Sequence, residues 1–397
     1  MQFLHRFANE IAGKQSDMEG KSMSELKDLM KKKLGFGCMR LPVLDGEQDR
    51  IDDQTFCEMI DSYMEQGFQY FDTAYPYHKE KSEEAVRRCL VERYDREQFF
   101  LADKMPVWLV KSEADYEPIF RKQLERCGVD YFDFYLLHAL DKESIQTIEA
   151  NGGFEFAKKI KADGRAKHIG FSFHDTADVL DETLSRHPEV EFVQLQINYY
   201  DWESDIVQSR KCYETAVKYG IPVIVMEPVK GGTLANLIGK SAEVLKELDE
   251  RASFASYAIR FVASLDQVML VLSGMSTKEQ LADNTSYMKD FVPLSDKEKH
   301  AIVRVREELD KLPTIPCTSC RYCVDGCPKK IVIPEVFSAY NMSVQFGVNA
   351  ISRGKYNNAV TGHGKASDCI RCGKCEGHCP QHLPIRDLLV DAVRTFE

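Results

Sequence analysis

The stretch FDTAYPYHKE, residues 71–80, starts as a short apolar run and ends in polar side chains. The runs FFLADK at 99–104 and FDFYLLH at 132–138 have the same form, and amphipathic stretches separate the three. This alternation is typical of βα units that build a parallel sheet, whose strands carry chemistry at their carboxyl ends. The polar side chains at the ends of these three runs include Asp72, Tyr77, Lys104 and His138.

Eight apolar runs of this kind occur between residues 34 and 276, and they predict the strands of a (β/α)8 barrel. Eight strands with their crossovers in about 250 residues match the usual size of that fold. An open, doubly wound sheet remains the alternative, because periodicity does not reveal strand order. The other five runs are LGFGCMRL at 34, HIGFSF at 168, FVQLQINYY at 192, IPVIVMEP at 221 and VMLVLSG at 268.

The composition is that of a globular protein, with 397 residues of which 44% are hydrophobic and 29% are charged. A net charge of -11 and the lack of a long basic run argue against nucleic-acid binding. No apolar run of about 20 residues and no secretory leader is evident, so we expect a cytoplasmic protein without a membrane segment. Residues 1–30 are expected to be an N-terminal extension of unknown role.

A domain boundary is expected near residue 312, where the composition changes. Pro313 and Pro316 end the preceding amphipathic stretch. The barrel is therefore predicted over 31–312, and a second domain over 313–397. This second domain has few apolar residues for its size, so we expect something besides a hydrophobic core to stabilise it.

Eight of the 13 cysteines fall in two runs with the same CxxCxxCxxxCP spacing, CTSCRYCVDGCP at 317–328 and CIRCGKCEGHCP at 369–380. Three closely spaced thiolates can hold three corners of one [4Fe-4S] cluster, and a fourth that precedes proline typically reaches the other cluster. Two zinc sites are the alternative, but the third and fourth thiols of each run disfavour them. We therefore assign one cluster to Cys317, Cys320, Cys323 and Cys379, and the other to Cys369, Cys372, Cys375 and Cys327.

The doubled cysteine run resembles the bacterial-type two-cluster ferredoxins. Residues 328–368 separate the two runs and include the helical stretch PEVFSAYNMSVQFGV. The tail is therefore more similar to the helical ferredoxin modules of respiratory and reductase subunits. This resemblance implies a module that folds around two [4Fe-4S] clusters and transfers electrons, and the crossed pairing is kept as a prediction for it.

Residues 34 to about 290 resemble the aldo-keto reductases. The segment DTAYPY carries an Asp and a Tyr five residues apart, as the family does, and the Lys and His follow at the next two strand ends. The resemblance implies hydride transfer between a nicotinamide and an aldehyde or ketone, with Tyr77 as general acid. Lys104, held by Asp72, would lower the pKa of Tyr77, and His138 would orient the carbonyl oxygen. Tyr75 lies nearby, and each of these residues alone also has an ordinary structural interpretation.

The same resemblance implies where the cofactor binds. Ser172 and Gln194 occupy the positions that hold the nicotinamide carboxamide, and Met226 stands where many members stack a tyrosine. Gly274, Met275 and a glutamine stand where NADP-specific members place Lys, Ser and Arg, so the choice between NADP and NAD stays open. The remaining predicted contacts are Pro228, Gly231 and Gly232 after the seventh strand, and Ser273, Gly274, Lys278, Gln280 and Asn284 after the eighth.

Together the two resemblances imply a carbonyl reductase whose clusters exchange single electrons with a redox partner protein. A hydride carries two electrons and each cluster carries one, so coupling them normally needs a flavin, for which no motif is evident. The alternatives are structural, redox-sensing or partner-docking clusters, a ferredoxin-linked reductase of a non-carbonyl substrate, and a barrel that only binds. Trp108 and Trp202 are expected to line the pocket, while the substrate and the oligomeric state stay open.

Overall fold

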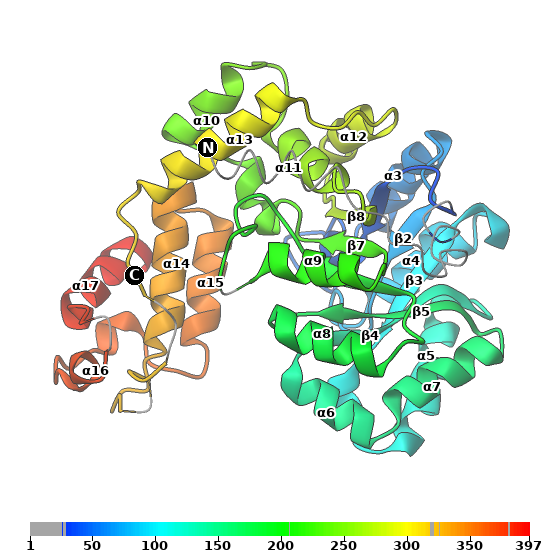
Figure 1. The fold of residues 1–397 in the computed structure, drawn as a ribbon, viewed down its shortest axis with the longest axis horizontal. Helices are drawn as coiled ribbons and strands as arrows, with labels where there is room; N and C mark the ends of the chain where they lie inside the picture. Colours follow the sequence, from blue (N-terminus) through cyan, green and yellow to red (C-terminus); the bar gives the residue numbers. More distant parts are fainter. Residues whose placement is uncertain (1–25, 27–28, 206, 318–320, 325, 380–381) are drawn as a thin grey trace. The chain divides into compact units, whose positions relative to one another are not determined.

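The computed structural model describes residues 26, 29–205, 207–317, 321–324, 326–379 and 382–397. Parallel strands form a closed barrel in which each strand pairs with its neighbours in sequence and the last pairs with the first (Figure 1). The predicted barrel is therefore confirmed, and the open sheet is wrong. The strands are β1 (Leu34–Gly37), β2 (Tyr70–Asp72), β3 (Phe100–Met105), β4 (Phe132–Leu140), β5 (Ala166–Phe173), β6 (Phe192–Gln196), β7 (Val223–Met226) and β8 (Val268–Gly274).

Helices alternate with the strands and cover the outside of the barrel (Figure 1). The first of them begins after Asp52, whose side chain accepts a hydrogen bond from the Thr55 N–H, as N-cap residues do. The helix before β4 ends at Gly128, whose φ of 70° is readily adopted only without a side chain. These helices are α3 (Asp53–Glu65), α4 (Ser82–Val86), α5 (Tyr116–Cys127), α6 (Lys142–Ala150), α7 (Gly153–Ala162), α8 (Ala177–Arg186), α9 (Ser209–Lys218), α11 (Phe254–Ala263) and α12 (Lys278–Met288).

Aromatic side chains fill the barrel near the amino-terminal ends of its strands. Tyr70 packs against Phe134 with ring centroids 5.1 Å apart, and Phe134 packs against Phe192 at 5.3 Å. Gly170 leaves room for the Phe192 ring, because a Cβ at this position would lie 2.9 Å from Phe192 Cζ. These buried rings close that end of the barrel and leave the carboxyl ends of the strands to form a site.

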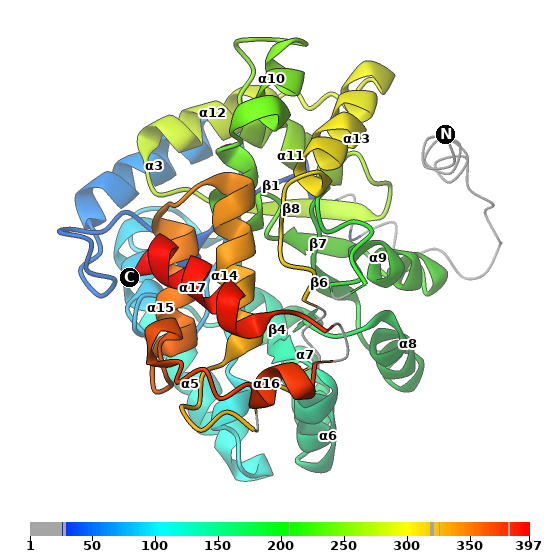
Figure 2. The same ribbon diagram turned by 90° about the vertical axis from the view of Figure 1, so that its left-hand side faces the viewer.

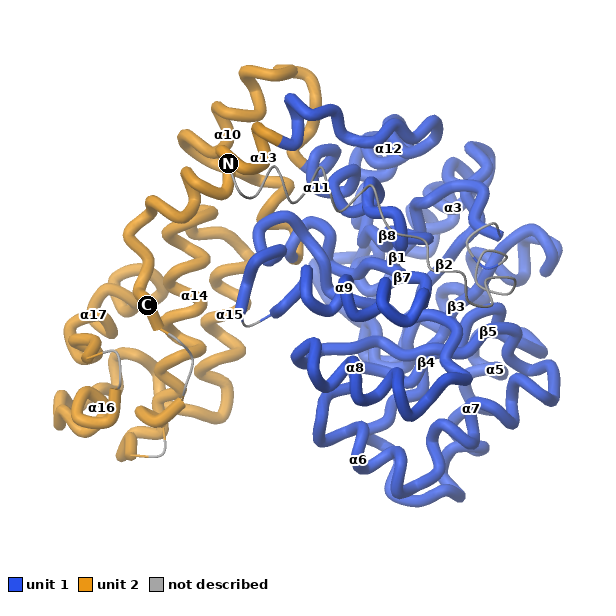
Figure 3. Tube along the Cα trace, in the orientation of Figure 1, with its two compact units in different colours: residues 1–230, 255–299 blue, residues 231–254, 300–397 orange. Residues whose placement is uncertain are grey.

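The chain divides into two compact units, of which the second consists of residues 231–254 and 300–397 (Figure 3). Its helices are α10 (Gly239–Lys246), α14 (Ile333–Phe346), α15 (Ala350–Val360), α16 (Lys374–Gly377) and α17 (Ile385–Phe396), and α13 (Asp296–Asp310) lies across the division. Within this unit α14 packs against both α15 and α17 (Figure 2). The helical character expected of the tail is confirmed, while the boundary at 312 stays a prediction.

The hydrophobic core of the second unit is small and is bordered by cysteines. Phe337 of α14, Tyr356 of α15 and Leu389 of α17 are buried in it, and Tyr356 stacks on Phe396 with centroids 4.7 Å apart. Thiols therefore take a large share of the surface that surrounds this core. The cysteines that pack in or against it are Cys317, Cys323, Cys327, Cys369, Cys375 and Cys379.

The predicted N-terminal extension, 1–30, lies outside the described residues except at positions 26, 29 and 30. Of these, Leu26 is buried in the aromatic cluster at the amino-terminal end of the barrel. Over the described part of the chain, no helix combines the length and the apolar character needed to cross a bilayer.

Candidate functional site

Three of the four predicted catalytic residues are joined by hydrogen bonds at the carboxyl ends of β2 and β3. The ammonium of Lys104 donates to Asp72 Oδ1 over 2.6 Å, to the Thr73 carbonyl oxygen over 2.8 Å and to the Tyr77 hydroxyl over 3.2 Å. The Lys104 side chain is fully buried, and that of Asp72 is 3% exposed. All three ammonium protons therefore have acceptors, which fixes Nζ between a carboxylate and a phenol.

A strained turn after β2 holds Tyr77 in place. Residues 78–80 all have positive φ, from 51° to 67°, which residues other than glycine rarely adopt. His78 Nε2 accepts a hydrogen bond from the Leu41 N–H over 3.0 Å, and its Nδ1–H donates to the Gln48 carbonyl oxygen over 2.8 Å. This histidine thus ties the loop after β1 to the turn that carries Tyr77. Sequence reasoning missed it, although it lies within the stretch 71–80.

A bulge near the end of β4 determines how His138 is presented. The register of β4 against β5 shifts between Leu137 and Leu140, and Ala139 has a φ of 56°. The Ala139 N–H, which loses its strand partner there, donates to Ser172 Oγ over 2.7 Å. The residue predicted to bind the nicotinamide carboxamide therefore also stabilises the bulge beside His138.

The imidazole of His138 is neutral and borders the phenol ring of Tyr77. Its ring lies edge-on to that of Tyr77, with centroids 6.1 Å apart at 81°, and 5.2 Å from the ring of Trp108. Burial, with contributions from Lys104 and His174, holds the pKa of His138 well below its usual 6.5. Its Nδ1 is buried and has no hydrogen-bond partner among the described residues. A neutral ring with an unpaired nitrogen suits the predicted role of orienting a carbonyl oxygen.

The electrostatic effect on Tyr77 differs from the one expected. Burial raises the pKa of the hydroxyl above its usual 10.0, and Lys104 lowers it without cancelling that effect. Burial also lowers the pKa of Lys104, but Asp72 and Tyr77 outweigh it, so the ammonium stays charged. The lowering that Lys104 was expected to cause is present, but it is smaller than the effect of burial. Tyr77 is therefore protonated at neutral pH.

Another predicted cofactor residue belongs to the same network. Gln194 of β6 is buried, and its Nε2 donates to Asp72 Oδ2 over 3.1 Å. Both carboxylate oxygens of Asp72 thus have donors, one from Lys104 and one from Gln194. Met226 ends β7, and the buried Pro228 follows it. Gln194 lies in the middle of β6, whereas Met226 and Pro228 lie at and just beyond the carboxyl end of β7. The contact of these residues with a nicotinamide stays a prediction.

The loop between β8 and α12 is held by contacts within the protein. Asn284 Nδ2 donates to Ser273 Oγ over 2.9 Å, and its Oδ1 accepts a hydrogen bond from the Tyr287 hydroxyl over 2.6 Å. Gln280 Oε1 accepts a hydrogen bond from the Ser276 N–H over 2.7 Å. The side-chain amides that were predicted to touch the cofactor therefore already have structural partners.

A cavity of about 530 Å³ lies between this loop and the loop after β1. The Arg40 side chain borders it and covers Gly274, where an added Cβ would lie 3.2 Å from Arg40 Cβ. Lys278 also lines the cavity, and its ammonium is paired with Glu58 of α3. Two of the glycines predicted as cofactor contacts, Gly231 and Gly232, belong to the second unit and have φ of 65° and 105°.

One cavity in the second unit is lined by the four cysteines that the crossed assignment grouped together. These are Cys327, Cys369, Cys372 and Cys375. The backbone N–H of Ile331 donates to Cys327 Sγ over 3.4 Å, which is the kind of contact that tunes cluster sulfurs. The rest of the wall combines apolar side chains with two cations, which suits a buried anionic group. It includes Ile331, Ile333, Leu389, Lys329 and Arg386.

The other predicted set is only partly described, because Cys320 lies outside the described residues. Cys317, Cys323 and Cys379 border the same core as the first set. Within the part of the chain that is described, no three His, Cys, Asp or Glu side chains group closely enough for one metal ion. A [4Fe-4S] cube spreads four thiolates around several iron atoms, so the cavity lined by four cysteines is the feature that fits it.

Two family models match the chain. The aldo/keto reductase family matches residues 33–307, and the 4Fe-4S dicluster domain matches residues 316–383. An uncharacterized oxidoreductase of Schizosaccharomyces pombe is 27% identical over 268 residues, which cover 65% of this chain and 81% of that protein. The 7-acetyl-epi-neemfruitin B aldo-keto reductase of Melia azedarach is 26% identical over 275 residues, or 63% of this chain and 78% of its own.

Solved structures show the same fold. An aldo-keto reductase from Klebsiella pneumoniae in complex with NADPH superposes with a TM-score of 0.56 at 20% identity, covering 69% of this chain and 90% of its own. The holo form of a Bacillus halodurans aldo-keto reductase gives a TM-score of 0.55 at 22% identity, covering 69% and 91%. With the closed barrel, the matched family model and the second matched domain, the chain belongs to the aldo/keto reductase family and carries a C-terminal 4Fe-4S dicluster domain.

Proposed function

We propose that this protein reduces the carbonyl group of a small aldehyde or ketone with a nicotinamide cofactor, and that two [4Fe-4S] clusters carry electrons in its tail. The contact that carries the proposal is the Lys104 ammonium, which bonds both Asp72 and the Tyr77 hydroxyl. A bound reduced nicotinamide would supply a hydride to the carbonyl carbon. The NADPH complex of the Klebsiella pneumoniae relative supports NADP as the cofactor.

The residues of this chain would supply the proton and hold the substrate. Tyr77 gives the proton of its hydroxyl to the carbonyl oxygen as the alkoxide develops, and Lys104 stabilises the phenolate that remains. The neutral imidazole of His138 donates a hydrogen bond to the same oxygen and orients it. Gln194 and Lys104 together hold the side chain of Asp72 in place through hydrogen bonds to its two carboxyl oxygens. Hydride and proton add across the C=O bond, so the reaction balances as a two-electron reduction.

The clusters are proposed to exchange single electrons with a protein partner. The cavity lined by Cys327, Cys369, Cys372 and Cys375 supports a cluster there, with Lys329 to balance its charge. The second cation of the wall, Arg386, is paired with Glu376. The second possibility is that the clusters only hold the small helical unit together, and the position of six cysteines around its core favours this alternative.

Anaerobic purification followed by iron and sulfide analysis tests the proposal directly. We expect equal amounts of iron and acid-labile sulfide, and oxidation of NADPH or NADH by aldehydes and ketones. The absorption spectrum before and after NADPH addition distinguishes the two roles of the clusters. Bleaching would indicate electron exchange with the nicotinamide, whereas an unchanged spectrum beside normal carbonyl reduction would favour a structural role. Carbonyl reduction that is absent with every substrate class would contradict the proposed function.

The pH dependence of carbonyl reduction should follow Tyr77. The hydroxyl must be protonated to donate, and its pKa is raised above 10.0, so kcat/KM should stay level through neutral pH and fall only above about pH 10. Titration of His138 should cause no change in kcat/KM near pH 6.5, because the pKa of this residue lies well below that value. The reverse oxidation needs the phenolate and should speed up as pH rises. Initial rates from pH 6 to about 10.5 in both directions would check this, and a reduction limb near neutral pH would contradict it.

The ion pair at the cavity between the loop after β1 and the loop after β8 should influence the choice of cofactor. Lys278 is paired with Glu58, so its charge is not available to a 2′-phosphate. Glu58→Gln should release it and lower the KM for NADPH by about 3-fold, with little change for NADH. The control is Glu279→Gln, which removes one charge at the same cavity without breaking that pair. Equal changes for both cofactors in Glu58→Gln would show that Lys278 does not face the phosphate.

A further inference from the structure

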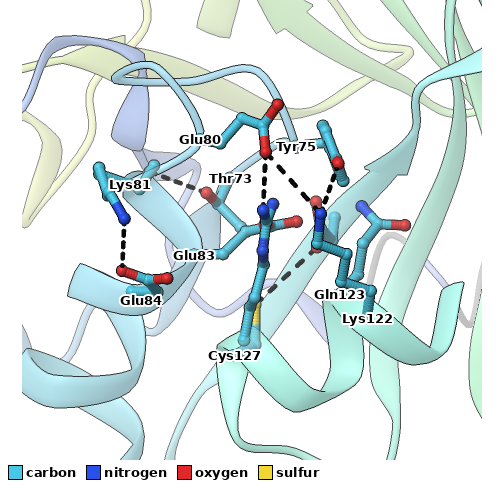
Figure 4. Close-up of polar contacts among 12 residues, drawn as sticks. Thr73, Tyr75, Glu80, Lys81, Glu83, Glu84, Lys122, Gln123 and Cys127 are labelled. Carbon is cyan, nitrogen blue, oxygen red and sulfur yellow. Dashed lines mark hydrogen bonds and ion pairs between the residues drawn. The ribbon is translucent and has the colours of Figure 1, made fainter. Parts of the chain in front are cut away.

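A second cluster of buried ionisable groups lies behind the proposed active site, on the outer side of β3. Glu83 of α4 and Asp103 of β3 have no exposed surface, and Cys127 of α5 is equally buried. Figure 4 shows Glu83 and Glu80 directed toward α5, where Gln123 and Cys127 lie. Two fully buried carboxyl groups would be costly if both were charged. The proposed reaction uses neither of them.

The side chains of Asp103 and Gln123 replace a missing strand partner of Lys104. The pairing of β2 with β3 ends where Asp72 meets Ala102, so no residue of β2 pairs with Lys104. Its backbone N–H donates instead to Asp103 Oδ1 over 2.8 Å, and its carbonyl oxygen accepts from Gln123 Nε2 over 2.9 Å. Two side chains therefore fix the backbone of the residue whose ammonium holds Tyr77.

The amide of Gln123 is itself held in one orientation. Its Oε1 accepts a hydrogen bond from the Tyr135 hydroxyl of β4 over 2.5 Å, and Gln123 and Tyr135 are both buried. The amide NH₂ must therefore face Lys104 rather than Tyr135. Asp103 Oδ2 lies 3.9 Å from Cys127 Sγ, which donates weakly to it.

The hydrogen bonds of the two carboxyl groups leave room for one proton. Glu83 Oε2 accepts from Arg126 over 2.9 Å, while Glu83 Oε1 is buried and has no donor among the described residues. The two carboxyl groups lie within hydrogen-bonding reach of each other, and burial raises the pKa of both, further raised at Asp103 by Glu83. A proton held between them gives the orphaned oxygen a partner. It also leaves one negative charge opposite Arg126 instead of two.

The other titratable groups around this pair keep their charge state at neutral pH. Arg126 is cationic and also binds Glu80 over 2.7 Å. Burial raises the pKa of Tyr135, of Cys127 and of Cys38 near β1, so these three stay neutral. Lys104 remains an ammonium on the inner side of β3. A change in charge near neutral pH would therefore come from the carboxyl pair itself.

We propose that Glu83 and Asp103 share one proton, and that with Gln123 they position Lys104 for the reaction. This inference rests on the proposed carbonyl reduction. The three residues do not touch the reacting atoms, so they are positioning residues. Asp103 and Gln123 fix the strand backbone at Lys104, which sets the place of Nζ between Asp72 and Tyr77. Glu83 acts through the proton that it shares with Asp103.

Infrared spectroscopy tests the shared proton without any assay of activity. Wild-type protein at neutral pH should show the carbonyl stretch of a protonated carboxyl group, and Glu83→Gln or Asp103→Asn should each remove it. The carboxamides keep the shape and supply an N–H where the acid supplied O–H, so the remaining carboxylate can ionise. Absence of the band in wild-type protein, or its persistence in both variants, would overturn the proposal. If one variant does not fold, the other assigns the band.

The pH profile of carbonyl reduction tests the positioning role. Glu83→Gln and Asp103→Asn each leave one negative charge on the pair. The pH at which the rate of carbonyl reduction falls should therefore stay the same in each single variant. The double variant E83Q/D103N removes that charge, so the pH of this fall should move down by about one unit, because the Tyr77 phenolate becomes easier to form. If both carboxyl groups were ionised, each single variant would already shift this pH, which would contradict the shared proton.

A matched pair of substitutions at residue 103 separates positioning from simple packing. Asp103→Leu loses the acceptor for the Lys104 N–H and should lower kcat about tenfold with an unchanged KM, and Asp103→Asn should restore most of it. Equal kcat in both variants would overturn the positioning role. If wild-type protein reduces no carbonyl compound, the proposed function fails, while the infrared result still decides the proton.

Discussion

Replacing Tyr77 by phenylalanine is expected to lower kcat for carbonyl reduction by about 10²- to 10⁴-fold, the usual contribution of a positioned general acid. The substitution removes the hydroxyl that Lys104 contacts over 3.2 Å and keeps the ring that borders His138. Because the proton donor is lost and the pocket wall remains, the KM for the nicotinamide cofactor should change little. Steady-state rates with the best aldehyde or ketone from a substrate screen measure both quantities.

The chain offers a matched control two residues earlier. The Tyr75 hydroxyl accepts a hydrogen bond from Lys122 over 2.9 Å, and its ring packs beneath Arg126 on the outer side of the barrel. Tyr75→Phe should therefore keep kcat within about 2-fold of the wild type, since no reacting group is removed. A large loss of kcat in Tyr75→Phe together with an active Tyr77→Phe would show that Tyr75, and not Tyr77, is the proton donor. Melting curves of both variants would show that each is folded.

The positions of the four predicted catalytic residues could be predicted because the ends of the strands fix them. Side chains at the carboxyl ends of consecutive parallel strands must meet at one edge of the sheet, whatever the helices between them do. Asp72 and Lys104 follow from this rule and form a hydrogen bond of 2.6 Å. The preference for Tyr77 over Tyr75 came from spacing, and Tyr77 is the one that contacts the lysine.

The backbone conformations that present Tyr77 and His138 could not be predicted. The positive φ of residues 78–80 and of Ala139 involves residue types that give no local signal for it. In both places a hydrogen bond to a distant segment holds the conformation. His78 of the turn binds the loop after β1, and Ser172 of β5 accepts from the N–H in the bulge. Such pairs depend on tertiary contacts, which periodicity in a single sequence does not contain.

The cofactor loops show a similar limit. Lys278 and Glu58 lie 220 residues apart, so their ion pair follows from the placement of α3 beside α12 and not from either segment. Asn284 was identified by its position in the resemblance, whereas its bonds to Ser273 and Tyr287 depend on the fold of this loop. The crossed cysteine assignment rests on the Cys–Pro spacing and stays a prediction.

The substitutions Cys327→Ser and Cys372→Ser are expected to remove the same cluster, although the two residues belong to different runs. Both line one cavity together with Cys369 and Cys375. Each variant should therefore lose half of the iron and acid-labile sulfide of the wild type, and the electron paramagnetic resonance spectrum of the reduced protein should be the same in both. Because a metal cluster contributes directly to folding, the second unit should also unfold at a lower temperature than in the wild type.

Cys379→Ser supplies the opposite test and Cys212→Ser the control. Cys379 lies in the same run as Cys372, so a run-by-run assignment predicts that these two variants share a spectrum. The crossed assignment predicts instead that Cys379→Ser keeps the cluster that Cys372→Ser loses. Cys212 lies on α9 of the barrel, and its loss should leave all of the iron bound. If Cys379→Ser shares its spectrum with Cys372→Ser and Cys327→Ser differs from both, the crossing is wrong. If it matches Cys372→Ser, each cluster draws ligands from both runs, so that two segments separated by α14 and α15 are joined through iron as well as through the core.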